Sequence, residues 1–244
     1  MLQPGLYEQV INEQLNKELS LIPQARKVVE QIERAEASKV LSQYLADIVQ
    51  KGLDNVLVKN GISGQIALTN KIVETIQQMT KESDFAYMSV DEGAEQLMAL
   101  LKDDDPLLIL GRTAAGIVRP ETSIAQSSLF TGATHEPSLV TELKKETLSS
   151  DQIDMLVSFI KWSGLRLIMD ELRDFTQNGG ELRIITTSYM GATDVKAIEE
   201  LRQLRGTRIK VSYDTKRTRL HAKTYVFYRD TGFTTAYVGS SNLS

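Results

Sequence analysis

The sequence predicts an α/β protein with a mixed, largely parallel sheet, helices on both faces of the sheet, and a small all-helical domain in front. Three observations predict this. Beyond residue 150, short apolar segments alternate with helix-length amphipathic ones, as in parallel strands joined by helices. The last two apolar segments, 224–227 and 235–238, are separated by a hairpin-length turn. Residues 1–105 carry only helical periodicity, so we expect two domains, 1–105 and 106–244.

The first domain is acidic and is expected to hold four helices. Apolar residues recur at helical spacing over residues 6–15, 28–52, 66–79 and 92–101. Gly52 is expected to end the second helix as a C-cap. This domain has no chemical motif, and we expect it to serve in packing or interaction.

The second domain begins as a loop and continues as alternating strands and helices. Residues 111–137 are rich in Gly, Ser, Thr and Pro, with one short strand expected at 128–130. The elements expected after Pro137 are a helix, a strand at 155–160, a helix at 165–177, a strand at 182–187, a helix at 194–204, and strands at 209–212, 224–227 and 235–238.

The composition excludes several kinds of site. Cysteine is absent and only two histidines are present, which excludes disulfides, thiolate metal sites and histidine-rich zinc sites. Any chemistry here must use oxygen ligands or no metal, and we predict no metal site. No apolar run approaches the roughly 18 residues of a membrane span, and the N-terminus lacks the basic start and apolar core of a secretory signal. A cytoplasmic protein with no membrane partner is expected.

Positive charge is concentrated in one short stretch although the net charge is −4. Residues 202–223 hold eight Lys and Arg against Asp214 alone. Such a stretch is either a solvated basic face or the place where phosphates bind. Its basic residues are Arg202, Arg205, Arg208, Lys210, Lys216, Arg217, Arg219 and Lys223.

The chemistry is expected at His221 and Lys223, which are followed by two strands and by Gly239-Ser240-Ser241-Asn242. In an extended chain, positions i and i+2 point the same way, so the imidazole and the ammonium lie side by side. Hairpin pairing then returns the glycine loop beside them, and Gly239 permits close backbone approach. A nucleophile, a cation and an amide donor around one point suit phosphoryl transfer.

The HxK pattern followed by GSxN resembles the signature of the phospholipase D superfamily, which includes metal-independent nucleases. Other stretches resemble one branch of it, the phospholipase D-like nuclease domain at the N-terminus of bacterial superfamily II (DEAD/DEAH-type) DNA helicases. These stretches are residues 119–123, 128–133, 135–139, 158–164, 186–194 and 213–219, and the opening residues 5–8 are also similar.

The resemblance implies a role for each matching residue. His221 is implied to be the nucleophile that forms a covalent phosphohistidine. Lys223 is implied to bind the non-bridging oxygens, and Asn242 and Ser240 to complete the oxyanion contacts. The residues expected to bind substrate are Arg217, Arg219, Gly239 and Ser241, and a salt-bridge role is an equal alternative for the two arginines.

The resemblance also implies partners. One motif per chain implies a homodimer with the site on its two-fold axis, in which a second histidine protonates the leaving oxygen. DNA is the implied substrate. Downstream helicase domains, with their ATP and Mg²⁺, are expected outside this chain, which we interpret as truncated at its C-terminal end. No cofactor is expected within it. The Asp that often follows the lysine by five residues is replaced by Tyr228, with Asp230 two positions later.

Three functional classes remain open: a DNA phosphodiesterase, a non-catalytic DNA-binding and dimerisation module, and a phosphatidyltransferase or phospholipase. The third is weakest, because no membrane span or basic amphipathic helix is present. Outside the motif, His135 is expected to be structural, with substrate contact as the alternative. Trp162 is expected in the core or at a domain interface, and Glu121 as either a solvated carboxylate or an acid near the site.

Overall fold

The computed structural model describes residues 2–101, 117–131, 133–134, 136–214 and 220–243. The chain divides into two compact units, Met1–Met98 and Ala99–Ser244. We call them the helical unit and the α/β unit. Each is described by itself.

The helical unit begins later than its periodicity predicts. Its elements are α1 (Glu13–Ser20), η1 (Gln24–Arg26), α2 (Ala37–Thr80) and η2 (Ser83–Tyr87). The predicted helix at 6–15 is wrong in its bounds, because Asn12 caps the helix: its Oδ1 accepts from the backbone N–H of Leu15 at 2.9 Å.

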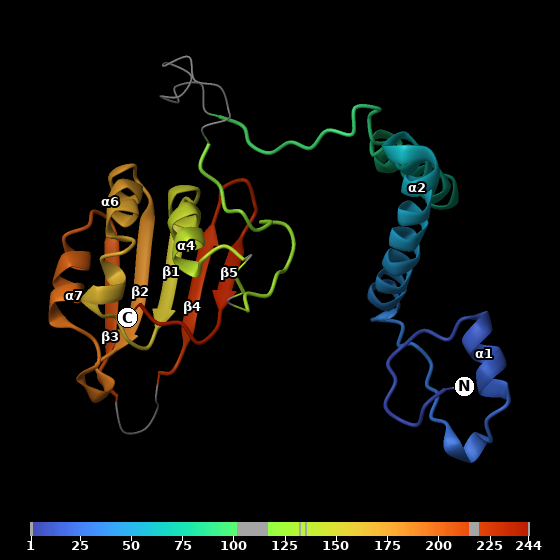
Figure 1. Ribbon diagram of the computed structural model, residues 1–244, viewed down its shortest axis with the longest axis horizontal. Coiled ribbons are helices and arrows are strands. Elements are labelled where there is room, and N and C mark those ends of the chain that lie inside the picture. The colour runs from blue at the N-terminus through green and yellow to red at the C-terminus, as the bar shows by residue number, and fades with distance from the viewer. Residues whose placement is uncertain (1, 102–116, 132, 135, 215–219, 244) are drawn as a thin grey trace. The chain divides into compact units, whose positions relative to one another are not determined.

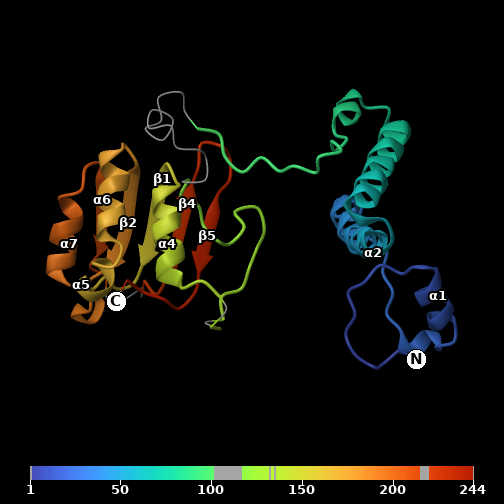
Figure 2. The ribbon, with the colours of Figure 1, turned by 45° about the horizontal axis from the view of Figure 1, so that its top comes forward.

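Helix α2 covers two of the predicted helices and is broken at Gly61, whose φ of 64° and ψ of −164° are not helical. The prediction that Gly52 ends a helix is therefore wrong. Gly52 instead packs near Leu68, because a Cβ built on it would lie 3.6 Å from Leu68 Cδ2. Gln65 Nε2 also donates to the carbonyl of Leu53 at 3.1 Å. The two stretches of α2 accordingly run in different directions (Figure 2).

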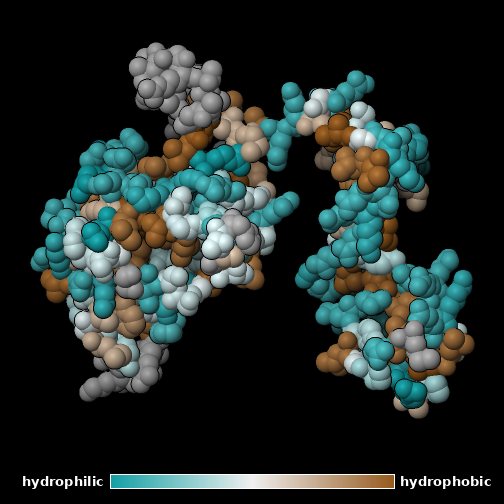
Figure 3. Space-filling view, in the orientation of Figure 1, coloured by the Kyte–Doolittle hydropathy of each residue, from teal (hydrophilic) through white to brown (hydrophobic). Residues whose placement is uncertain are grey.

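The helix predicted at 92–101 is wrong, since none of the described residues there is helical. The backbone of Val90, just before this segment, is held by the side chain of Asn70. The amide oxygen of Asn70 accepts from Val90 N–H at 2.8 Å, and its amide nitrogen donates to the Val90 carbonyl at 2.9 Å. No side chain described within residues 2–98 is fully buried, and apolar side chains reach the surface over α2 (Figure 3). None of the described helices combines the length and apolar character of a membrane span.

The predicted α/β class is confirmed. The elements of the α/β unit are α4 (Leu139–Leu148), β1 (Gln152–Val157), α5 (Trp162–Leu165), α6 (Met169–Gln177), β2 (Glu181–Thr187), η4 (Tyr189–Gly191), α7 (Val195–Arg202), β3 (Thr207–Ser212), β4 (Lys223–Tyr228) and β5 (Thr235–Val238). The strand order is β3-β2-β1-β4-β5, with β1, β2 and β3 parallel. Strand β4 is antiparallel to β1 and β5, so four of the five strands point one way.

One face of this sheet carries the core. Ile153, Met155 and Val157 on β1 are buried, and their register partners on β2 and β4 are buried with them. Helices α4 and α6 lie over the sheet (Figure 1), and their buried apolar residues join the same cluster. The alternate positions, such as Arg183 and Ile185, point to the opposite face and are exposed.

Three predicted elements differ from the structure. The strand at 128–130 is absent; Phe130 packs its ring against Tyr237, with centroids 5.7 Å apart, instead of entering a ladder. The helix at 165–177 is split into α5 and α6, because Ile168 has non-helical angles and buries its side chain. Strand β1 starts and ends three residues earlier than predicted.

Candidate active site

The predicted motif residues meet at one end of the sheet. Parallel strands β1, β2 and β3 all finish there, and β4 starts there, since Lys223 pairs with Val157. The N–H of Gly239, just after β5, donates to the carbonyl of Lys223 at 3.2 Å. The hairpin therefore returns the glycine loop beside the lysine, as the sequence predicts.

His221 and Lys223 lie side by side. Lys223 Nζ is 2.9 Å from Nε2 and 3.3 Å from Nδ1 of His221. The histidine is exposed, whereas Lys223 is only 8% exposed. This arrangement places an accessible imidazole beside a recessed lysine side chain.

Ser158 fixes the backbone between these two residues. Its N–H and its Oγ both donate to the carbonyl of Ala222, at 2.9 and 3.1 Å. Ser158 is itself fully buried at the end of β1. Double donation to one carbonyl holds the peptide plane, and with it the directions of the side chains on either side.

Besides the Gly239 N–H bond to Lys223, three contacts hold residues 239–243. The hydroxyl of Tyr225 donates to the carbonyl of Ser241 at 3.0 Å. Burial raises the pKa of Tyr225, so its hydroxyl keeps the proton that it donates. Asn242 Oδ1 accepts from the N–H of Phe159 at 3.3 Å, which leaves its amide N–H groups as donors. The carbonyl of buried Leu243 accepts from Lys161 N–H at 2.6 Å.

The side chains of Ser240 and Ser241 are exposed beside Lys223. A Cβ built on Gly239 would meet nothing within 4 Å, so no part of the described chain crowds this glycine. The space in front of it is open, which fits the predicted close approach of a ligand rather than of another segment.

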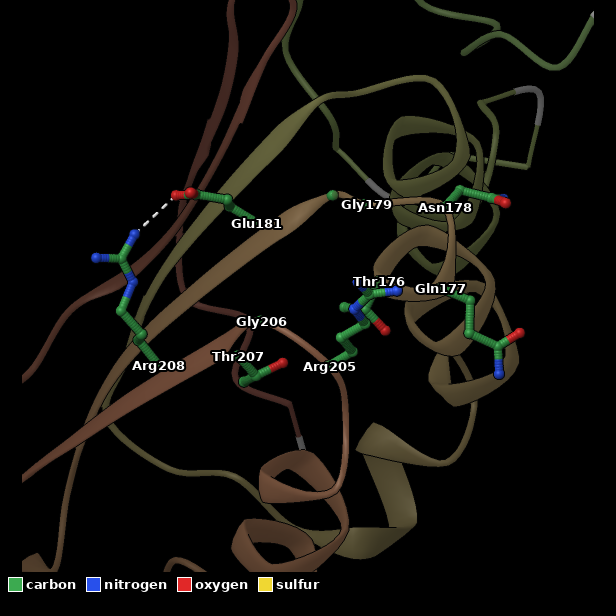
Figure 4. A pocket seen from close by; sticks show the side chains of 10 residues that line it. Thr176, Gln177, Asn178, Gly179, Glu181, Arg205, Gly206, Thr207 and Arg208 are labelled. Atoms are coloured by element: carbon green, nitrogen blue, oxygen red, sulfur yellow. Dashed lines mark hydrogen bonds and ion pairs between the residues drawn. The ribbon is translucent and has the colours of Figure 1, made fainter.

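The predicted basic stretch does not form a single surface at the site. Arg205 and Arg208 line a separate cavity of about 740 Å³ at the opposite end of the sheet, where β2 and β3 begin (Figure 4). Arg208 there pairs with Glu181 at 2.7 Å. Strand β3 runs from this end of the sheet to the end that carries the motif. Basic residues before β3 and after it, though near in sequence, therefore lie far apart. Arg217 and Arg219 lie outside the described residues.

Three further residues singled out in the sequence, Tyr228, Asp230 and Glu121, do not contact the motif in the described part of the chain. Tyr228 ends β4, five strand residues or roughly 17 Å from Lys223. Asp230 follows in the hairpin turn, where its N–H donates to Asp151 Oδ2. Glu121 forms an ion pair with Lys145 at 2.6 Å.

Trp162 packs against the core, as predicted, and Lys196 Nζ lies 4.5 Å from its ring centroid. His135 lies outside the described residues. Among the described residues, no three His, Asp or Glu side chains gather so that they could hold a metal ion.

Sequence reasoning missed Ser158, Tyr225 and a groove wall formed by residues 122–130. Ser158 could have been found as the first polar residue after a buried strand. Tyr225 has no signal in the sequence beyond that of a strand residue, because its contact with the Ser241 carbonyl forms only when the hairpin pairs.

One protein family and one solved structure are similar to parts of this chain. A family model described as "Cardiolipin synthase, PLD-like domain" matches residues 143–244. Polyphosphate kinase from Porphyromonas gingivalis is similar at 17% identity and a TM-score of 0.32, over 43% of this chain and 18% of that one. The match thus spans less than a fifth of the kinase chain. No curated protein matches the sequence. The segment that carries the sheet, the His221–Lys223 pair and the glycine loop is therefore similar to the phospholipase D-like domain.

Proposed function

We propose that the α/β unit is a metal-independent phosphodiesterase that cleaves DNA through a covalent phosphohistidine. The observation that carries the proposal is the contact between exposed His221 and recessed Lys223, with the glycine loop bonded to the same lysine. The match to the phospholipase D-like domain supports a phosphodiester substrate.

In the proposed reaction, a ring nitrogen of His221 attacks the phosphorus and a P–N bond forms. The P–O bond to the leaving strand breaks, and its electron pair stays on the leaving oxygen, which takes a proton from a second imidazole. Water then attacks the phosphorus, restores the free imidazole and returns a proton to the second histidine. The ammonium of Lys223 offsets the charge that builds on the non-bridging oxygens.

Asn242 and Ser240 are proposed as further donors to these oxygens. Asn242 has its Oδ1 occupied by Phe159 N–H, so the amide is oriented to donate. Ser240 is exposed next to Gly239. Gly239 and Ser241 are proposed to contact the substrate through the backbone, and Arg217 and Arg219 to bind its phosphates.

The chain has two histidines, His135 and His221, and only His221 belongs to the motif. The second imidazole is therefore proposed to be His221 of a second copy. A homodimer would bring two motifs together across a two-fold axis. We further propose that the chain forms the N-terminal part of an ATP-dependent DNA helicase. Sedimentation of the purified chain should show a dimer at micromolar concentration; a strict monomer that still cleaves would contradict the shared site.

Tyr228 stands where the phospholipase D superfamily often has an Asp, which raises the question of whether the site can catalyse the reaction. A carboxylate there would lie at the far end of β4, so its absence does not remove a group from the immediate surroundings of His221 and Lys223. Glu146 supplies a buried carboxylate in this hairpin region instead, pairing with Arg229 and accepting from Tyr237 at 2.9 Å.

Adduct trapping tests the mechanism. Labelled DNA is mixed with the protein in EDTA, quenched with denaturant, and the protein is examined for bound label. The proposal expects cleavage in EDTA and a base-stable, acid-labile adduct that is absent from His221→Ala. Metal-dependent cleavage that persists in His221→Ala would refute it. DNA binding without any cleavage would point to the non-catalytic module.

A further inference from the structure

A groove runs from the site along β5 on the side away from β1. Its volume is about 550 Å³. Residues Thr122–Phe130 line one side, and β5 with residues Gly239–Ser241 lines the other. Lys223 and Tyr225 also line it, so it opens directly onto the proposed phosphate site. The segment after Val118 passes beside β5 in both ribbon views (Figure 1, Figure 2).

The wall at residues 122–130 is anchored at its first end by Glu142, which is fully buried on α4. This carboxylate accepts from the N–H of Glu121 at 3.1 Å and from the N–H and hydroxyl of Thr122 at 3.0 and 2.7 Å. Charge-assisted hydrogen bonds of this kind are among the stronger ones in proteins. The start of the wall is therefore fixed to the helix that covers the sheet.

The second end is anchored by Glu136 and by an aromatic contact. Glu136 accepts from Thr131 N–H at 2.7 Å and hydroxyl at 2.8 Å, and from Ala133 N–H. The Phe130 ring lies against Tyr237 of β5. Between the two anchors, residues Ala125–Leu129 are all exposed, and Leu129 is 82% exposed. A loop tied down at both ends, with an exposed centre beside a site, is built to contact a ligand.

The lining chemistry suits a sugar-phosphate chain. Nine of its lining residues carry an aliphatic hydroxyl or amide side chain that can bond to a sugar or a phosphate: Thr122, Ser123, Gln126, Ser127, Ser128, Thr234, Thr235, Ser240 and Ser241. Among the described residues that line the groove, none is acidic and Lys223 alone has a charged side chain. Ile124, Leu129 and Phe130 add apolar surface for sugars and base faces. The groove therefore offers neutral hydrogen bonds along its length and one cation at its end.

We infer that this groove holds an unpaired nucleic-acid strand and leads its phosphate to Lys223. The inference rests on the proposed function and adds a substrate class to it. Lys223 is 8% exposed at the groove, so a phosphate must enter between the two walls to reach it. A duplex carries a second strand and stacked base pairs behind each phosphate, and a groove of about 550 Å³ is too small to admit them. A single strand can enter with its bases against the loop.

Binding to a labelled oligonucleotide tests the groove directly. Fluorescence anisotropy is measured with a single strand and with the matching duplex, using the whole chain. The wild type should bind the single strand at least tenfold more tightly than the duplex. The double variant Ser127→Asp, Ser128→Asp places two negative charges in a lining without described acids, which should weaken single-strand binding roughly tenfold. Ser38→Asp, at an exposed serine in the first turn of α2, is the matched control and should bind as the wild type does.

Gly239→Ala is a second variant that should fold normally, because its Cβ would meet nothing within 4 Å. It should weaken single-strand binding if the strand passes over this glycine. Equal binding of duplex and single strand, or unchanged binding in both groove variants, would overturn the inference. Tighter binding to anionic phospholipid vesicles than to the oligonucleotide, lost in the same variants, would overturn it in favour of a lipid groove.

A small chromogenic phosphodiester separates this inference from the proposed function, because it needs the catalytic groups and not the groove. The double variant Ser127→Asp, Ser128→Asp should therefore lose much less of its rate on this small diester than of its single-strand affinity, and the control Ser38→Asp, outside the groove, should keep the wild-type rate. If the wild type does not hydrolyse it but binds the single strand selectively, the proposed chemistry fails and the groove stands. If it hydrolyses the diester but does not discriminate between strands, the groove fails and the chemistry stands.

Discussion

Lys223 Nζ lies 2.9 Å from His221 Nε2, yet the two residues differ sharply in exposure. The contact follows from local geometry, because residues two apart on an extended chain point the same way. The difference in exposure follows from the sheet, where Lys223 is the first residue of β4 and pairs with Val157. An accessible imidazole beside a recessed lysine is the arrangement that the proposed attack on a phosphate would use.

The first prediction concerns Lys223. Lys223→Ala should lower the single-turnover rate of phosphodiester cleavage by roughly 10²–10³, since the ammonium matters most where charge builds in the transition state. Oligonucleotide affinity should change much less. Because Lys223 is nearly buried, Lys223→Met, which keeps the aliphatic stem, separates loss of charge from loss of packing. Equal losses in rate and in binding would assign the lysine to ground-state binding alone.

The second prediction separates the two ends of the Asn242 amide. Asn242→Ala removes the acceptor for Phe159 N–H and should cost about 1 kcal/mol of stability in urea unfolding. Asn242→Asp keeps the acceptor, so its stability should stay near that of the wild type. The rates should fall in a different order, with Asp lowest, since it replaces a donor by a negative charge beside the phosphate. If the rates of the two variants instead follow their stabilities, Asn242 only holds the loop in place and does not contact the phosphate.

The third prediction is a pH dependence at the wall anchor. Burial would raise the pKa of Glu142, but hydrogen bonds from Thr122 and Glu121 and the charge of Lys145 outweigh it, and the pKa lies below its ordinary 4.5. A depressed carboxyl pKa gives stability that is present above the ordinary value and lost as pH falls through the lower, folded-state value.

Glu142→Gln should therefore be less stable than the wild type by about 1–3 kcal/mol at neutral pH, and the difference should shrink below about pH 4. Urea unfolding at several pH values measures it. Asp174→Asn, which removes an exposed carboxylate on α6, is the control. A Glu142→Gln difference that is constant with pH would show that the carboxylate charge does not hold the wall.

The fourth prediction concerns the basic stretch. If Arg217 and Arg219 bind phosphates, replacing each by alanine should lower the slope of log affinity against log salt by roughly one unit. Arg205→Ala should leave the slope unchanged, because Arg205 lines the cavity at the opposite end of the sheet. An effect of Arg205→Ala as large as that of Arg217→Ala would mean that the whole stretch contacts nucleic acid.

The sequence by itself determined the α/β class, the strands β2, β4 and β5 to within one or two residues, and the pairing of His221 with Lys223. These are properties of local pattern: alternation on a strand, amphipathic helices and the hairpin spacing. It failed in the helical unit, where apolar spacing predicted a helix at 6–15 whose bounds are wrong and a helix at 92–101 that does not form. Caps and side-chain-to-backbone bonds, such as those of Asn12 and Asn70, decide those bounds and carry no periodic signal.

Only the tertiary structure decided which distant residues meet at the site. Ser158 and Tyr225 reach the motif through the order of strands in the sheet, and Glu142 fixes a wall that starts twenty residues before it in sequence. Strand β3 runs from one end of the sheet to the other and so separates Arg205, which precedes it, from Lys223, which follows it. The physical reason is that side-chain direction is set by local backbone geometry, whereas proximity between strands is set by hydrogen-bonded register across the whole sheet.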